Sequence, residues 1–184
     1  MSGDRTLSAE ESVDNDEAWM VFERIAFREK GSPVDIKGCA RNIAEECKGF
    51  PLAIRLVAAA MRGKTIVDEW NISLSSIKNQ RQPSSSYPQT LHPQLYPLLR
   101  WCYDALPNSH IKNCFLYCAM YPKGYSYIKV QELVRMWIGE GLVGSKQENH
   151  SMDMAIGRRY LNILLDHFFF QNASPNEEQP MSSN

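Results

Sequence analysis

The chain has 184 residues, with 20 Lys and Arg against 21 Asp and Glu and a formal net charge of −1. A general polyanion binder carries a clear basic excess, so this balance argues against one; no apolar run approaches the ~18 residues that a membrane span requires. The amino terminus leads into no apolar segment, so we expect neither secretion nor membrane association and place the chain in the cytoplasm. Five cysteines, an odd number, indicate reduced thiols rather than a disulfide framework.

The first predicted helix occupies residues 14–30, where Asp14 or Asn15 can cap its start. Apolar residues recur in it at spacings of three and four, which indicates one buried helix face. Trp19 and Phe22 lie on that face and are predicted to be core residues.

Residues 31–78 predict a small helical bundle. Its first helix has one apolar face and is followed by Gly49, a residue type favoured just after a helix end. The next helix starts at Pro51, a good first-turn residue. Because this second helix is apolar almost all round, we expect it to be the central, buried one. A shorter helix around Trp70 completes the bundle.

Residues 79–93 contain three prolines and four Ser or Thr, which predicts a linker. Amphipathic helices follow, and the aromatic residues 168–171 predict a short strand. Helices followed by a strand are the order of a winged helix, which we place at residues 94–171.

The predicted fold is therefore mainly α: a small helical bundle, then a winged-helix domain with at most a short β-hairpin wing. Polar tails are expected at residues 1–13 and 172–184. The predicted core of the second unit lies on the apolar stripes of two helices and comprises Cys114, Phe115, Cys118 and Trp137.

Two patterns look like chemical sites, and we interpret both as structural. A phosphate loop needs a glycine five residues before Gly63-Lys64-Thr65, but Ala58 stands there inside a helical alanine run. The tripeptide is therefore expected to end a helix and begin a turn. His110, Cys114 and Cys118 lie four apart, but structural zinc takes four ligands, so we predict core cysteines and no metal site. No nucleophile stands near a positioned histidine, so we expect no enzyme activity.

The strongest candidate site is the turn Gly49-Phe50-Pro51. Proline at a helix start fixes the backbone and leaves its flat apolar ring exposed at that start. This ring either forms part of a plain interhelical turn or packs against the face of a nucleotide base.

Gly49-Phe50-Pro51-Leu52-Ala53 resembles the Gly-x-Pro-Leu-Ala motif of the NB-ARC domain of plant nucleotide-binding leucine-rich-repeat disease resistance proteins. Residues 114–122 and 133–142 resemble further signatures of that family, and residues 16–27 resemble the helix that closes its nucleotide-binding subdomain. The combination covers roughly residues 16–171.

The resemblance implies a fragment of an immune-receptor switch, comprising the ARC1 bundle and the winged-helix ARC2 subdomain, which close over ADP in the full receptor during the defence response. Of the family's nucleotide-contacting residues only the motif proline transfers, onto Pro51, with Gly49 and Leu52 shaping its turn. ADP or ATP is the cofactor of the full-length family, a slow ATPase. The phosphate loop would lie upstream of the residues present, so no cofactor is expected for this chain alone.

The resemblance also implies the partners: a phosphate-binding subdomain, leucine-rich repeats and possibly other receptor chains. One alternative is a stand-alone helical adaptor that binds related receptors. A winged-helix nucleic-acid binder is the other, but the would-be recognition helix has two residues of each charge sign (Lys129, Glu132, Arg135 and Glu140), whereas phosphate neutralisation needs a positive excess.

Overall fold

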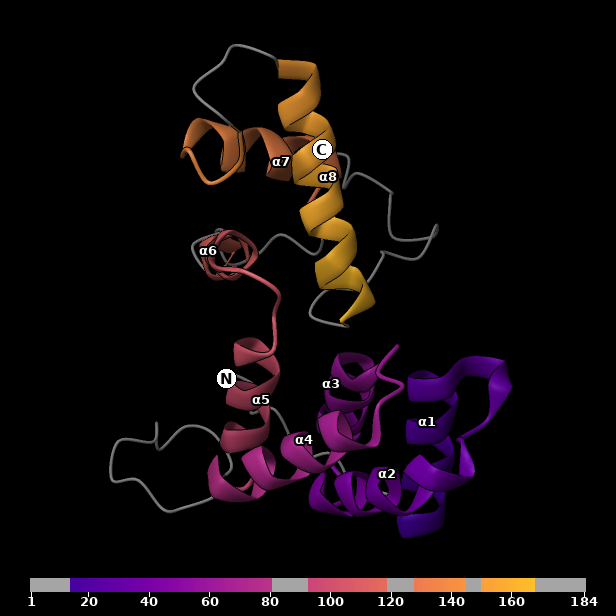
Figure 1. Cartoon of the computed structure of the whole chain (residues 1–184). Helices are drawn as coiled ribbons and strands as arrows, with labels where there is room; N and C mark the ends of the chain where they lie inside the picture. The colour runs from indigo at the N-terminus through magenta and orange to yellow at the C-terminus, as the bar shows by residue number, and fades with distance from the viewer. Residues whose placement is uncertain (1–13, 81–92, 119–127, 145–149, 168–184) are drawn as a thin grey trace, which may run out of the picture. The chain divides into compact units, whose positions relative to one another are not determined.

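The computed structural model describes residues 14–80, 93–118, 128–144 and 150–167, and every structural statement refers to these residues. They form helices and connecting turns (Figure 1), so the mainly α prediction is confirmed. The strand predicted at residues 168–171 lies outside the described residues. None of the described helices has the length and apolar character needed to cross a membrane.

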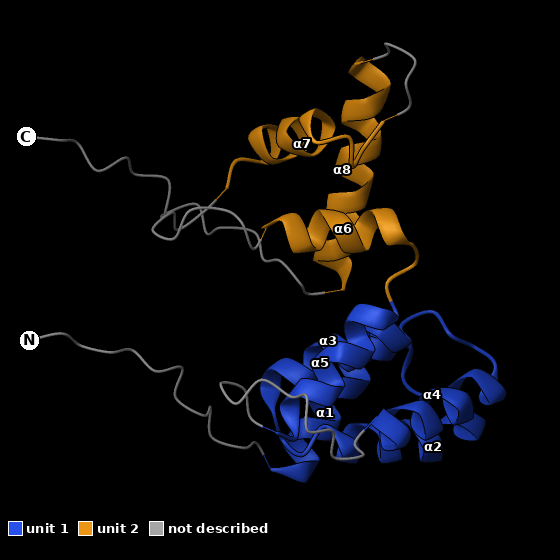
Figure 2. Ribbon diagram, turned by 90° about the vertical axis from the view of Figure 1, so that its left-hand side faces the viewer, with its two compact units in different colours: residues 1–105 blue, residues 106–184 orange. Residues whose placement is uncertain are grey.

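The described helices, in chain order, are α1 (Asn15–Phe27), the short 3-10 helix η1 (Arg28–Lys30), α2 (Val34–Glu46), α3 (Pro51–Met61), α4 (Val67–Gln80), α5 (Leu95–Asp104), α6 (Ser109–Cys118), α7 (Val130–Gly139) and α8 (His150–Asp166). They form two compact units that divide between residues 105 and 106 (Figure 2).

Helix α3 is the centre of the first unit. It packs against α1, α2 and α5, while α2 packs against α1 and α4. Most of its side chains are buried, namely Ala53, Ile54, Leu56, Val57, Ala58, Ala59 and Met61. The prediction of a central, nearly all-apolar helix is therefore confirmed, since such a helix is stable only when neighbours cover every side.

Helix α1 is fixed at both ends. The Asp14 carboxylate caps its start by accepting a hydrogen bond from the Asn15 N–H (2.7 Å). Trp19 and Phe22, predicted as core, are 7% and 0% exposed and stack with ring centroids 6.2 Å apart. At its other end Phe27 stacks on Trp70, with centroids 5.2 Å apart.

Helix α5 is placed differently from the sequence-based division, which assigned residues 94–171 to the winged helix. Its buried face, which includes Leu98, Trp101 and Cys102, packs against α3 and α4 of the first unit. The chain therefore passes from one unit to the other after residue 105, not within residues 79–93, most of which lie outside the described residues. A composition typical of linkers indicates an irregular segment, but it does not show which unit the following helix packs against.

The second unit comprises α6, α7 and α8, with α7 and α6 both packed on α8. Trp137 and Cys114 are fully buried, as predicted. Phe115 and Cys118, also predicted as core, are only half-buried. For Phe115 the reason is helical geometry, because Ile111 and Cys114 lie in the buried stripe and Phe115 lies about 100° further round the helix than Cys114. Cys118 is on the same side as these two residues, but it is the last residue of α6.

Helices α7 and α8 cross at a glycine. A Cβ atom at Gly157 would overlap the Val134 side chain, and both residues are buried. Only the hydrogen of glycine lets the two helices approach this closely.

We therefore expect Gly157→Ala to lower the free energy of unfolding by about 1–3 kcal/mol, the usual cost of overpacking. Gly139→Ala is the matched control, because Gly139 lies in α7 and a Cβ atom added there would meet nothing within 4 Å; it should be neutral or stabilise by up to ~1 kcal/mol. Urea unfolding measures both. Equal midpoints for the two variants would contradict the close crossing.

Candidate functional site

The candidate site is the turn between α2 and α3. Two consecutive residues, Lys48 (φ 52°) and Gly49 (φ 72°), adopt left-handed conformations after the end of α2. Glycine accepts this conformation freely, whereas a residue with a Cβ pays roughly 1–2 kcal/mol. The Phe50 N–H closes the turn by donating to the Cys47 carbonyl (3.0 Å). The predicted tight turn is thus confirmed.

The first residues of α3 are accessible to solvent. Pro51 occupies the first turn, where its missing N–H costs no helical hydrogen bond. The Phe50 carbonyl accepts the first helical hydrogen bond, from the Ile54 N–H (2.9 Å). Pro51 is half-buried and Leu52 is 43% exposed, so the turn presents apolar surface to solvent.

The residues next to this turn in the sequence differ in their burial. Cys47 and Ala53, which flank it, are 0% exposed and hold it against the bundle. Lys48 and Arg55 are exposed. The turn is therefore an apolar edge with an exposed cation on each side of it in the sequence, and Lys48, Gly49, Phe50, Pro51 and Leu52 include no acid–base pair.

Gly63-Lys64-Thr65 forms a helix end and a turn, as predicted. Helix α3 ends at Met61, and Gly63 is left-handed (φ 81°). The Lys64 ammonium donates to the Ser73 hydroxyl (3.2 Å), and the Lys64 carbonyl accepts from the Trp70 indole N–H (3.1 Å). These contacts fasten the turn to α4.

The cysteines of α6 are a buried thiol, Cys114, and a half-buried one, Cys118. Burial, with a smaller contribution from Cys118, raises the pKa of Cys114 to about 12. Burial raises the pKa of Cys118 to about 11, partly opposed by the Trp137 indole, and its thiol donates to the Cys114 carbonyl (3.2 Å). His110 is exposed. Within the part of the chain that the structure describes, no three His, Cys, Asp or Glu side chains come together as metal ligands.

Helix α7, the would-be recognition helix, has no basic face. Lys129 lies 3.8 Å from the Glu132 carboxylate, and Glu140 accepts a hydrogen bond from the Tyr117 hydroxyl (3.1 Å). Arg135 is exposed on the same helix, three residues after Glu132. Its electrostatics do not favour contact with a phosphate backbone.

Sequence reasoning missed one polar cluster between α1 and α2. The Arg41 guanidinium lies 5.6 Å from the centre of the Trp19 ring and 3.6 Å from the Asp16 carboxylate. It borders a hollow of about 170 Å³. No local spacing signals this cluster, because it depends on how α2 packs across α1.

The comparisons with known proteins agree with the resemblance. Residues 120–183 match the winged helix domain of disease resistance proteins. The probable disease resistance protein At1g61190 of Arabidopsis thaliana is 32% identical over 146 residues, which cover 79% of this chain and 15% of that protein. The Arabidopsis disease resistance proteins UNI and SUMM2 are each 31% identical, over 79% and 91% of this chain and 16% and 18% of their own lengths.

The chain is thus homologous to one region of plant disease resistance proteins and spans less than a fifth of these relatives. Helices α7 and α8 lie within the residues that match the winged helix domain. The resemblance read from the motifs is confirmed, whereas the roles of Pro51, Gly49 and Leu52 toward nucleotide stay predictions.

The raised thiol pKa values give a test of the α6 core. At about pH 8 a thiol reagent should label Cys114 and Cys118 slowly in the folded chain, because thiolates react and these thiols stay protonated. In denaturant all five cysteines should react without prior reduction.

Because the folded pKa values of Cys114 and Cys118 lie above the unfolded value of 9.0, the stability that these two thiols contribute is complete below about pH 9 and is lost as pH rises toward 11–12. Cys114→Val should reduce that loss. Rapid native labelling, or stoichiometric zinc in the purified chain, would overturn this assignment.

Proposed function

We propose that this chain supplies two regulatory subdomains of a plant immune-receptor switch, the helical bundle and the winged helix, which close over ADP in the whole receptor during the defence response. The observation that carries the proposal is the Gly49-Phe50-Pro51 turn, held at the open start of a buried helix in a chain homologous to disease resistance proteins. The cytoplasm is the compartment that suits such a switch.

The proposed role of the turn is to close one side of the nucleotide site. Pro51 offers a flat ring for the face of a base, and Leu52 continues the apolar surface. Gly49 fixes the direction of the turn through its left-handed backbone. An apolar edge that is already formed before the ligand arrives loses little conformational entropy on binding.

The proposed role is binding rather than catalysis. In the NB-ARC family that this chain resembles, a loop of backbone N–H groups, a lysine and a magnesium ion hold the phosphates of the nucleotide. A single proline against a base contributes on the order of 1 kcal/mol, whereas association costs at least ~4 kcal/mol of lost freedom. Nucleotide should therefore bind only when a phosphate-binding subdomain is also present.

Isothermal titration calorimetry tests whether ADP binding requires the phosphate-binding subdomain in addition to the Pro51 turn. We expect no measurable heat of ADP binding for the chain alone with magnesium. When a relative's phosphate-binding subdomain is added, ADP should bind, and Pro51→Ala should weaken binding by about fivefold to tenfold, which corresponds to ~1 kcal/mol.

Pro33→Ala is the matched control, since Pro33 is exposed and precedes α2 of the same bundle. It should leave ADP affinity unchanged. A micromolar dissociation constant for the chain alone, or equal effects of the two proline variants, would contradict the proposal.

A further inference from the structure

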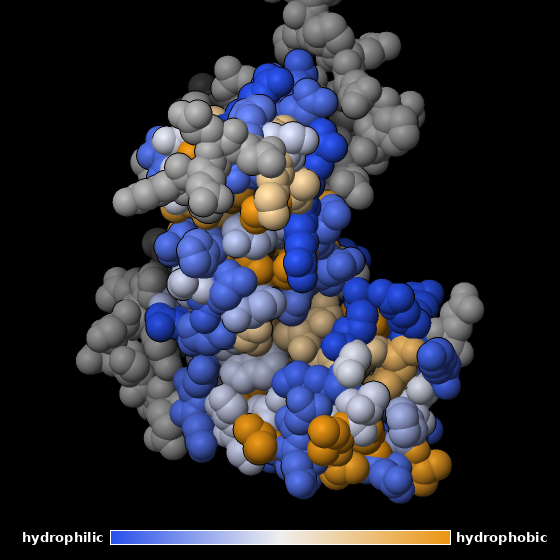
Figure 3. Space-filling model, turned by 45° about the horizontal axis from the view of Figure 1, so that its top comes forward, coloured by the Kyte–Doolittle hydropathy of each residue, from blue (hydrophilic) through white to orange (hydrophobic). Residues whose placement is uncertain are grey.

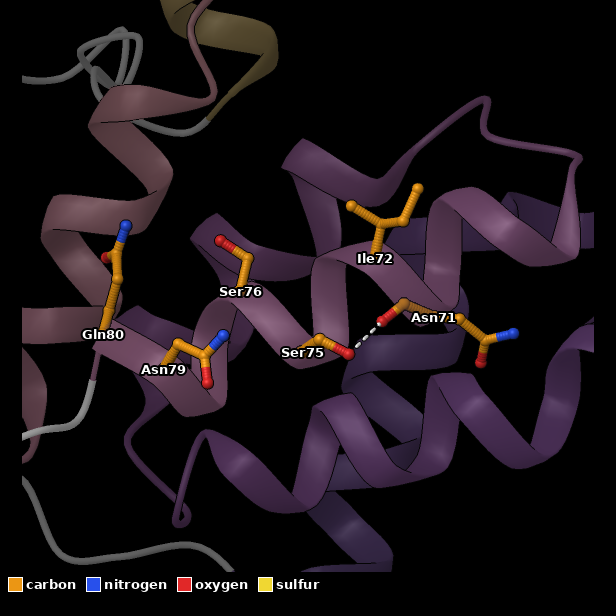
Figure 4. Close-up of a pocket in the computed structure, with 6 residues that line it drawn as sticks. All are labelled: Asn71, Ile72, Ser75, Ser76, Asn79 and Gln80. Carbon is orange, nitrogen blue, oxygen red and sulfur yellow. Dashed lines mark hydrogen bonds between the residues drawn. The ribbon is translucent and has the colours of Figure 1, made fainter.

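The buried side of the Pro51 turn makes more specific contacts than the described surface offers to a ligand. The outward face of α4 has a hollow of about 580 Å³, shown in Figure 4, whose lining consists of Asn71, Ile72, Ser75, Ser76, Asn79 and Gln80. None of these side chains is ionisable, and the Ser75 hydroxyl donates to the Asn71 carbonyl of its own helix (2.9 Å). Figure 3 shows apolar residues standing among hydrophilic ones on the face that it draws.

Cys47 joins α2 to the turn. Its N–H donates to the Ala44 carbonyl (3.0 Å) at the end of α2, and its thiol donates to the Ile43 carbonyl (3.5 Å). Its own carbonyl accepts from the Phe50 N–H (3.0 Å), the hydrogen bond that closes the turn. Because one residue holds both the end of α2 and the residue before Pro51, a shift of Cys47 shifts the turn.

Helix α5 lies beside Cys47. The Cys47 side chain is 0% exposed, and Cys102, on the buried face of α5, is 1% exposed. Burial, with a smaller contribution from Cys47, raises the pKa of the Cys102 thiol well above its usual range. An electrostatic contribution of this kind falls off with distance, so the two thiols are neighbours. Since α5 also packs on α3, it lies against the elements that precede and follow the turn.

We propose that Cys47 is a positioning residue for the Pro51 turn and that Cys102 of α5 holds Cys47 in place. This inference rests on the proposed nucleotide-binding role of the turn, to which it adds a regulating element. A side chain in a close-packed interior has little room to move, and removing a neighbour leaves space into which it can shift. Cys47 is buried and acts on the site through the backbone of Phe50.

The place of α5 in the chain gives this contact a regulatory consequence. Helix α5 is the last helix of the first unit, and the second unit begins at residue 106. A shift of α5 on α3 moves Cys102 and, through Cys47, the apolar edge that Pro51 offers to a base, because packed interiors transmit strain. The second unit can therefore alter nucleotide affinity through α5 without contacting the nucleotide.

Amide hydrogen exchange of the chain alone tests the positioning role without nucleotide, with urea unfolding to show that each variant stays folded. Cys102→Ala should speed exchange of the Phe50 N–H by at least about fivefold, because the acceptor on Cys47 is no longer held in place. Cys47→Ala should act in the same direction. Cys102→Val, which keeps an apolar side chain, should restore the wild-type rate. Ile36→Val is the matched control, because Ile36 is 2% exposed near the other end of α2; it should leave Phe50 exchange unchanged.

ADP affinity tests the link to the proposed site. With a relative's phosphate-binding subdomain present, Cys102→Ala should weaken ADP binding by about threefold. In a Pro51→Ala background it should have no further effect, because the group that it positions is gone. A purely structural role would give the same loss in both backgrounds.

The two measurements distinguish this inference from the proposed function. Unchanged Phe50 exchange in Cys102→Ala, an equal effect of Ile36→Val, unchanged ADP affinity, or a loss of affinity that persists at full size in the Pro51→Ala background would overturn the positioning role. Faster Phe50 exchange together with no ADP binding by any combination of chains would instead contradict the nucleotide-binding role of the turn.

Discussion

The burial of α3 is the constraint on which the first unit depends. A helix that is apolar on nearly every side cannot face water, so α1, α2 and α5 must cover it. Seven of its eleven residues are buried, a packing that fixes both helix ends. At one end it holds the Pro51 turn in place, and at the other Arg62 reaches α1 by donating to the Ile25 carbonyl (3.1 Å).

The second unit depends on a different constraint, the close approach of α7 and α8 at Gly157. Trp137 and Leu164 are fully buried in this unit, and the raised thiol pKa values on α6 follow from the same exclusion of water. Each unit thus has its own core, as expected of separate domains.

Local sequence patterns predicted the helix cap and the turns, because these features depend only on residues close together in the chain. The cap at Asp14, one of the two residues predicted for it, the turn at Gly49 and the turn at Gly63 follow from residue types that favour those backbone shapes, and all three are present. The all-round apolar pattern identified α3 as central. Motif order also identified the family, which the comparisons bear out.

Features that depend on distant packing were not predicted. The placement of α5 with the first unit depends on which helices its apolar face packs against. The spacing of apolar residues shows that this face exists but does not show which helices cover it. The prediction placed Phe115 and Cys118 on the apolar stripe of their helix, but how completely a side chain on such a stripe is covered depends on how the helices pack. The Arg41–Trp19 contact needs two helices to be docked before it exists. For Pro51 the structure supplies the shape of the turn, and its ligand remains a proposal.

Amide hydrogen exchange of the isolated chain is the most direct test of the central role of α3. The N–H groups of Ile54 and of residues 56–59 should exchange only when the whole first unit unfolds, because these residues are buried and lie within the hydrogen-bonded helix. Their opening free energy should therefore equal the free energy of unfolding of that unit measured in urea, and should be the highest in the unit. Exchange of these amides through local opening, faster than that of α1 or α2, would contradict the account.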